Sequence, residues 1–266
     1  TPLIQPNFVS RVGYLGELEG ADQILDGTFI TPPEIDSFTA KFITQLKMED
    51  TVRDSKPITK AISTQSYQES WKKMRPNTSS SPFGPEFVHY IAGSQDNNIA
   101  DFDATMANIP YASGYNPKTW TKFTDVLIPK KTTSSAIEKL RIIVLFHAMF
   151  NMNNKRIGRD MIANAERLNQ IPWEVYGSRK RHRAIECAVN KVLTTDIARQ
   201  EHRSMALCSN DAKSCFDRIL HAIATICMRR VGVSRQTCLM MFGTLAQAQH
   251  YIRTNYGDSD QAYSTA

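Results

Sequence analysis

The chain has 266 residues and a formal net charge of +6 at pH 7; 41% of its residues are hydrophobic and 22% are charged. These proportions are typical of a soluble globular protein, and the length allows one large domain or two small ones. No apolar run approaches the ~20 residues of a membrane-spanning helix, and no signal-peptide pattern is present, so we expect no membrane association.

Charge is divided unevenly along the chain. Residues 1–116 hold 9 Lys and Arg against 14 Asp and Glu, a net −5, whereas residues 117–266 hold 23 against 12, a net +11. A basic half joined to an acidic half favours a polyanionic partner. An ordinary solvated basic surface is the alternative.

The cysteines indicate a reducing compartment. None forms a C-x-x-C pair, and no His lies at zinc-finger spacing, so we expect no structural zinc. An odd number of cysteines without a secretion signal favours free thiols, and we expect an intracellular protein, nuclear or cytoplasmic. The five are Cys187, Cys208, Cys215, Cys227 and Cys238.

The acidic half is predicted to be helical. Residues 31–48 have the pattern of an amphipathic helix that begins at Thr31 or Pro32. Further helices are predicted over 57–75 and 97–109, separated by the breaker-rich "RPNTSSSPFGPEF". The apolar face expected for the first helix is Ile35, Phe38, Phe42, Ile43 and Leu46.

The basic half mixes strands and helices. "TKFTDVLIPKK" and "KLRIIVLF" predict a β-hairpin with a basic loop. Residues 146–200 are predicted to be helical with an interruption near "NQIPWEVYG", followed by a strand over 204–209 and helices over 215–230 and 235–254. Helices on a small central sheet make an α+β fold that is mostly helical.

Asp211 follows the predicted strand. A carboxylate at the end of a strand sits on a rigid platform, and Mg²⁺ usually takes one or two carboxylates and completes its octahedron with water and phosphate oxygens. The spacing of Asp211 and Asp217 alone is explained better by a helix cap and an exposed surface acid.

The segment "SNDAKSCFDRI" around Asp211 resembles motif A of the reverse transcriptases, in the Asp-x4-Phe/Tyr form. Upstream segments resemble the same family in the same order. "SSSPFGPEFVHYIA" is similar to the Ser-Pro-x-Gly segment and "YNPKTWTKFTDVLIPKK" to the Ile-Pro-Lys stretch. "LRIIVLF" is similar to the Arg-Pro-Ile segment, with Ile142 for the proline, and "YGSRKRHRAIECAVNKVL" to the Gln-x-Gly-Phe-Arg segment, with Tyr176 and Ser178 as departures. The residues of these segments are most similar to those of a non-viral retroelement of a eukaryotic genome.

The resemblance implies the fingers and a partial palm of a right-hand polymerase. It divides the chain into an unassigned, mainly helical region at 1–78, a fingers-like region with the basic hairpin at 79–203, and a partial palm at 204–266. The implied function is RNA-directed DNA synthesis by two-metal nucleotidyl transfer. The implied cofactor is magnesium, and the implied partners are an RNA or DNA template-primer and deoxynucleoside triphosphates.

The resemblance also implies roles for residues of the motif A segment. Asp211 would bind both catalytic metals, which in such sites lie about 3.5–4 Å apart, and the Ala212 carbonyl would add a contact. Phe216 would be the steric gate under the sugar; an aromatic residue in the core is its alternative. For Asp217 we favour a structural hydrogen bond over metal ligation.

Basic residues complete the implied site. Arg141, on the second hairpin strand, would bind the triphosphate together with Lys130. For Lys131 the same role and a purely structural role at the strand edge have equal weight. The implied role of the cluster at "GSRKRHR" is sequence-independent contact with template phosphates. The alternative is an ordinary solvated basic turn. Its candidate residues are Arg179, Lys180, Arg181 and Arg183.

The family's later motifs are missing from the sequence. No Asp-Asp dipeptide and no Gln-Gly segment occurs, and the chain runs from Thr1 to a polar "GDSDQAYSTA", so we expect a truncated or processed product that is inactive alone. The alternatives are a non-catalytic nucleic-acid-binding relic of a retroelement, a hydrolase with its own metal site, and a helical interaction scaffold.

Overall fold

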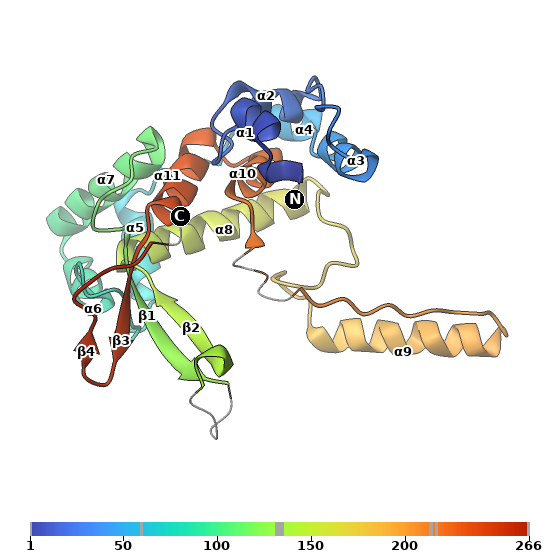
Figure 1. Cartoon of the computed structure of the whole chain (residues 1–266). Helices are drawn as coiled ribbons and strands as arrows, with labels where there is room; N and C mark the ends of the chain where they lie inside the picture. Colours follow the sequence, from blue (N-terminus) through green and yellow to red (C-terminus); the bar gives the residue numbers. More distant parts are fainter. Residues whose placement is uncertain (1, 59–60, 131–135, 213–214, 216–217, 265–266) are drawn as a thin grey trace.

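The computed structural model describes residues 2–58, 61–130, 136–212, 215 and 218–264. In this part of the chain, helices surround a small mixed sheet (Figure 1), which confirms the α+β class, with far more helix than strand. The division into polymerase fingers and palm stays a prediction.

Four helices form the N-terminal end, after a short 3-10 helix at Pro2–Ile4. The predicted helix over 31–48 is shorter than expected, because Asp36 caps it: Asp36 Oδ1 accepts a hydrogen bond from the Thr39 amide at 2.9 Å. Its predicted apolar face was partly wrong, since the Phe38 side chain is 82% exposed. The helices are α1 (Pro6–Val12), α2 (Glu19–Asp26), α3 (Ser37–Gln45) and α4 (Asp50–Arg53).

The next group consists of α5 (Thr64–Lys72), α6 (Phe87–Gly93) and α7 (Asn97–Ser113). The helix predicted over 57–75 begins later, where the Ser63 hydroxyl accepts a hydrogen bond from the Ser66 amide. The helix predicted to end before Pro110 continues for one more turn and ends at Gly114, whose φ of 78° closes it.

The sheet has the strand order β2-β1-β3-β4. β1 and β2 are antiparallel, which confirms the predicted hairpin; β1 and β3 are parallel, and β3 and β4 antiparallel. The helix predicted over 249–254 was wrong: this segment is β3 and pairs with β1, with Phe123 opposite His250. The strands are β1 (Lys122–Pro129), β2 (Leu140–Leu145), β3 (Gln249–Thr254) and β4 (Gly257–Asp258).

Four longer helices follow the hairpin, whose second strand is preceded by a 3-10 helix at Ile137–Lys139. The expected helices with an interruption between 146 and 200 are confirmed. The helix predicted over 215–230 begins at His221, and the one predicted over 235–254 ends at Ala246. The four are α8 (Ala148–Arg167), α9 (Ala184–Gln200), α10 (His221–Arg230) and α11 (Arg235–Ala246).

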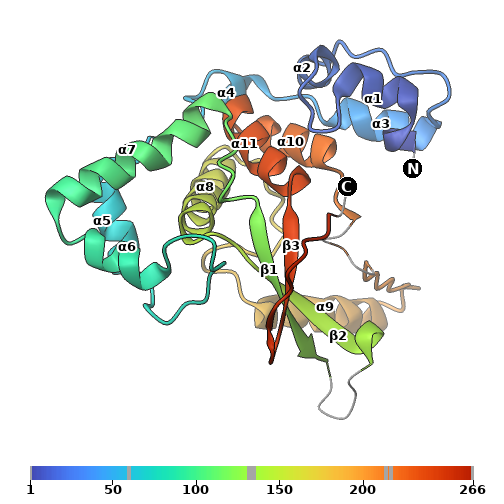
Figure 2. The same cartoon turned by 60° about the vertical axis from the view of Figure 1, so that its left-hand side comes forward.

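The main core lies where α5, α6, α7, α8 and α11 meet beside the sheet (Figure 2). Trp71, Phe150 and Met240 come from the three predicted regions 1–78, 79–203 and 204–266, respectively, and all three residues lie in this core. A second core joins the N-terminal helices to α10, with Phe8, Ile24 and Ile226 in its interior. The folded cores therefore cross the predicted segment boundaries.

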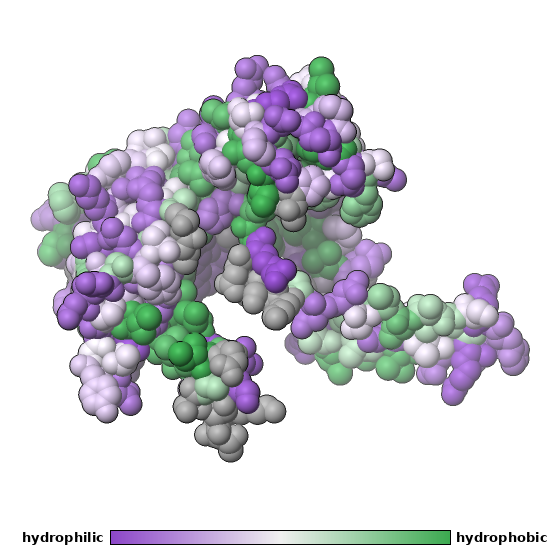
Figure 3. Space-filling view, in the orientation of Figure 1, coloured by the Kyte–Doolittle hydropathy of each residue, from purple (hydrophilic) through white to green (hydrophobic). Residues whose placement is uncertain are grey.

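Helix α9 is an exception to this packing, because none of its residues is buried. It projects from the body (Figure 1), and apolar side chains remain visible along it (Figure 3). The large exposed apolar residues of α9 are Ile185, Val189, Val192, Leu193 and Ile197.

Candidate nucleic-acid interface

The segment that carries Asp211 is extended but is not a strand. The strand predicted over 204–209 was wrong: these residues belong to no strand and are all exposed. A strand needs a hydrogen-bonded neighbour, and this segment pairs with none of the four strands in the described part of the sheet. Asp211 is exposed.

The position of this segment relates Asp211 to the basic turn. The segment leaves the C-terminal end of α9 and runs back along the helix (Figures 1 and 2). Its far end thus returns toward the start of α9, which is where the turn at 179–183 lies. The extended segment and the basic turn therefore both belong to the projecting arm that α9 forms (Figure 1).

The basic turn presents three cationic side chains to solvent. Lys180, Arg181 and Arg183 are exposed, and no carboxylate in the described part of the chain lies within 4 Å of their charged groups. Arg181 adopts a φ of 67°, and the Arg183 amide donates to Glu186 Oε2 at 3.1 Å, which begins α9. The backbone conformation and this hydrogen bond thus fix the positions from which the three side chains extend.

Arg179 is used differently from its neighbours. Its Nε lies 3.0 Å from Glu166 Oε1, and its Nη1 donates to the carbonyls of Pro172 and Val175 at 3.0 and 3.1 Å. The Arg179 side chain is only 10% exposed. It ties the loop after α8 to that helix, and this engagement leaves little of the guanidinium for a template phosphate.

The hairpin carries the other basic candidates. Arg141 lies opposite Ile128, close to the loop that joins the two strands of the hairpin, and both side chains are exposed. Lys130 follows β1, and its amide donates to the Lys139 carbonyl at 3.0 Å. Because Arg141 lies on β2 and Asp211 on the arm, the structure places the two candidates on separate projections of the body (Figure 1).

Three candidates lie outside the described residues: Phe216, Asp217 and Lys131. Ala212 is described and exposed beside Asp211. Among the residues that the structure describes, no group of three His, Cys, Asp or Glu side chains could hold a metal ion. Asp211 offers one carboxylate, and Mg²⁺ usually takes one or two in addition to water and phosphate oxygens.

Sequence reasoning missed two groups of polar side chains. The first is the contact between the buried Asp125 and the half-buried His250, which no local pattern indicates because the residues are 125 positions apart. The second is a basic group on α8, formed by Lys155, Arg156 and Arg159. Its signal was present in "NKRIGRD", since Lys155 and Arg156 precede Arg159 by four and three residues, the two spacings that make side chains neighbours on a helix.

No family model matches the chain, and no curated protein matches it either. In the described residues, no helix has both the length and the apolar character needed to cross a membrane. The functional assignment therefore depends on the chain's own residues and on the motif order in its sequence.

Proposed function

We propose that the chain is the nucleic-acid-binding part of an RNA-directed DNA polymerase of a non-viral retroelement. The observation that carries the proposal is the arm: three exposed cations, Lys180, Arg181 and Arg183, precede α9, and the extended segment with Asp211 returns toward them. The order of reverse-transcriptase-like segments along the sequence supports the same assignment.

The cations would contact the phosphates of a template or primer strand. Contacts of this kind position a strand without reading its bases, and they release counterions, so that binding weakens as salt rises. The two arginines can bind phosphate through two N–H groups at once. Without a carboxylate partner within 4 Å among the described residues, these side chains need not break an ion pair to bind.

The same proposal gives Asp211 and the hairpin their roles. Asp211 would supply one carboxylate to a magnesium site, and Arg141 and Lys130 would contact the triphosphate of an incoming nucleotide. Because the sequence has no Asp-Asp dipeptide, a second set of acidic ligands is not evident. We therefore expect this chain alone to bind nucleic acid and nucleotides without extending a primer.

A binding experiment tests the first part of the proposal. A fluorescein-labelled 20-nucleotide single strand is titrated with the wild-type chain and with Lys180→Gln/Arg181→Gln/Arg183→Gln. We expect a loss of affinity of roughly 100-fold at low salt, since each phosphate contact contributes about 1 kcal/mol or more. The matched control is Lys41→Gln/Lys56→Gln/Lys118→Gln, which removes the same charge from exposed positions elsewhere. Equal losses in both variants would mean that only net charge matters.

A primer-extension experiment tests the second part. The wild-type chain is incubated with a primed template, magnesium and deoxynucleotides, and we expect no extension. Extension that Asp211→Asn abolishes would show that the chain has a complete site, contrary to our expectation.

The second candidate function is a nucleic-acid-binding module without chemistry, which the same exposed basic turn favours. The two candidates differ in nucleotide binding. A polymerase part should bind a deoxynucleoside triphosphate in a way that Arg141→Gln weakens, whereas a simple module should bind the strand and show no such dependence on Arg141.

A further inference from the structure

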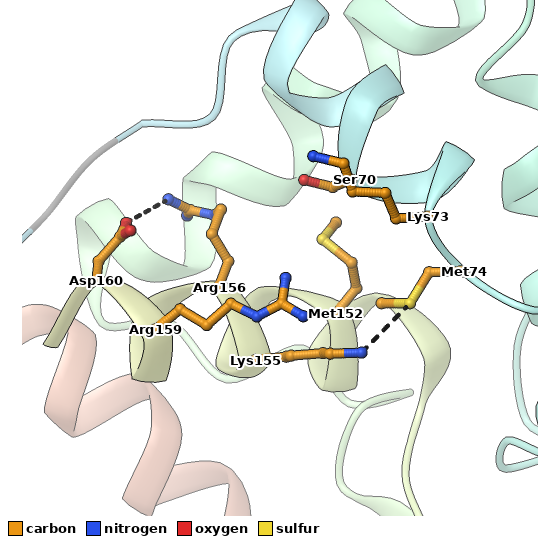
Figure 4. A pocket seen from close by; sticks show the side chains of 8 residues that line it. All are labelled: Ser70, Lys73, Met74, Met152, Lys155, Arg156, Arg159 and Asp160. Atoms are coloured by element: carbon orange, nitrogen blue, oxygen red, sulfur yellow. Dashed lines mark hydrogen bonds and ion pairs between the residues drawn. The ribbon is translucent and has the colours of Figure 1, made fainter. Parts of the chain in front are cut away.

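Helices α5 and α8 enclose a basic pocket away from the arm. Figure 4 shows Arg156 and Arg159 rising from α8 and Lys155 extending along it to Met74, while α5 contributes Ser70 and is followed by Lys73 and Met74. The cavity has a volume of about 200 Å³. Cavities that hold drug-sized ligands are larger, roughly 300–1,000 Å³, so this one is suited to a small group.

The charges that line this pocket are not balanced. Among the described residues that line the pocket, four are cationic, Lys73, Lys155, Arg156 and Arg159, and one is a carboxylate, Asp160, which lies 3.9 Å from Arg156. Within the described residues, no carboxylate lies within 4 Å of the charged groups of Lys73, Lys155 or Arg159.

The partner of Lys155 indicates the same deficit of negative charge. Its Nζ lies 3.8 Å from the Met74 sulfur, and a thioether is a weak acceptor for an ammonium group. Lys155 and Arg159 are also four residues apart on α8, where like charges destabilise a helix. An anion between them would relieve this repulsion.

The pocket is built on a rigid base. Met152 and Ile157 of α8 are 1% and 3% exposed and belong to the main core, so the helix that carries the cations is fixed. Arg156 is largely buried, and this burial lowers the pKa of its guanidinium because charge is costly away from water. A bound anion would offset part of that cost.

We propose that this pocket binds phosphate groups, one or two at a time, through Lys73, Lys155, Arg156 and Arg159. The phosphate could belong to a nucleic-acid strand or to a small free compound, and both present the same tetrahedral anion. The site is separate from the arm and includes neither Asp211 nor the basic turn, so it does not depend on the function proposed above.

Calorimetric titration with inorganic pyrophosphate tests the proposal. Binding to the wild-type chain is compared with binding to Lys155→Gln/Arg159→Gln, and the matched control is Lys41→Gln/Lys118→Gln, which has the same net charge. We expect pyrophosphate to bind at least roughly tenfold more weakly to the pocket variant, since hydrogen bonds to charged groups are lost. The control should bind like the wild type. Circular dichroism and the melting temperature of each variant report whether it is folded.

A second titration, with a 20-nucleotide oligothymidylate, distinguishes the two phosphate sources. If the strand uses the pocket, the pocket variant binds it more weakly than the control does, and pyrophosphate competes. If only the pyrophosphate titration changes, the ligand is a small phosphate compound. If a folded pocket variant binds both probes as the control does, or if the wild-type chain binds neither, the proposal is wrong. We expect variants of the basic turn to leave the pyrophosphate titration unchanged, so that failure of the pocket is separable from failure of the arm.

Discussion

The Asp125 carboxylate and the His250 imidazole join two strands of the sheet that are distant in sequence. Both Asp125 oxygens lie 3.1 Å from His250 Nδ1, and Asp125 is 1% exposed. The Tyr263 hydroxyl also donates to Asp125. Desolvation, followed by this hydrogen bond, raises the pKa of Tyr263 to about 12. This cluster fixes β3 beside β1.

We expect Asp125→Asn to lower the free energy of unfolding by about 2 kcal/mol, because a buried charged acceptor shared by two donors is replaced by a neutral one. Urea denaturation measures the change. Glu174→Gln, at an exposed carboxylate, serves as the control and should change stability by less than about 0.5 kcal/mol. Equal stability of the two variants would show that the cluster contributes nothing.

His147 should make stability depend on pH. Burial lowers the pKa of His147 from its ordinary 6.5 to about 4. Between these values the unfolded chain binds a proton that the folded chain does not, so stability falls as the pH falls, by up to about 3 kcal/mol for this group. Above pH 6.5 the group contributes no pH dependence.

In the wild type, His147 Nδ1 accepts a hydrogen bond from the Met149 amide at 3.2 Å. The variant His147→Asn keeps an acceptor for this amide but cannot be protonated. We expect its unfolding free energy to change less than that of the wild type between pH 6.5 and 4. The exposed His89, whose Nδ1 accepts from the Glu86 amide, provides the control, and His89→Asn should retain the wild-type slope. The same slope in His147→Asn as in the wild type would contradict the assignment.

Trp71 should be the most sensitive aromatic residue of the main core. Its ring is 0% exposed, stacks on Tyr90 at 4.8 Å between centroids and meets Phe87 edge-on at 5.7 Å. Trp71→Ala should cost about 3–5 kcal/mol of unfolding free energy by leaving a cavity. Trp173→Ala, at a position that is 68% exposed, should cost under about 1 kcal/mol in the same denaturation experiment.

Arg179 should act on the loop after α8 and not on nucleic acid. Because it holds Glu166 and the carbonyls of Pro172 and Val175, we expect Arg179→Gln to speed limited proteolysis within 170–178 several-fold. Its affinity for an oligonucleotide should fall less than that of Arg181→Gln. A larger loss of affinity in Arg179→Gln, with unchanged proteolysis, would assign Arg179 to the template instead.

Local patterns predicted those elements whose signals lie within a few residues. Alternating apolar residues and a polar connection predicted the β1–β2 hairpin, and amphipathic spacing predicted α8 and α11. The segment 249–254 was assigned to a helix because its pattern continued that of α11, whereas pairing with β1 over a separation of more than 120 residues makes it a strand. Tertiary context decided the outcome there.

The candidate site was predictable only as a set of residue types. Density of charge identified the basic turn, but sequence could not show that Arg179 is engaged internally while Lys180 and Arg181 are exposed. The strand expected before Asp211 depended on a neighbour that the described sheet does not provide. The α8 pocket forms only where α5 packs against α8. The spacing of the basic residues on α8 therefore could not by itself predict a pocket.

The most direct test of the account is the salt dependence of single-strand binding by the chain. For single strands, the slope of log K against log salt is about −0.7 for each phosphate contact. The account predicts that Lys180→Gln/Arg181→Gln/Arg183→Gln has a slope shallower than that of Lys41→Gln/Lys56→Gln/Lys118→Gln by about 2. Identical slopes in the two triple variants would contradict a nucleic-acid interface at the basic turn.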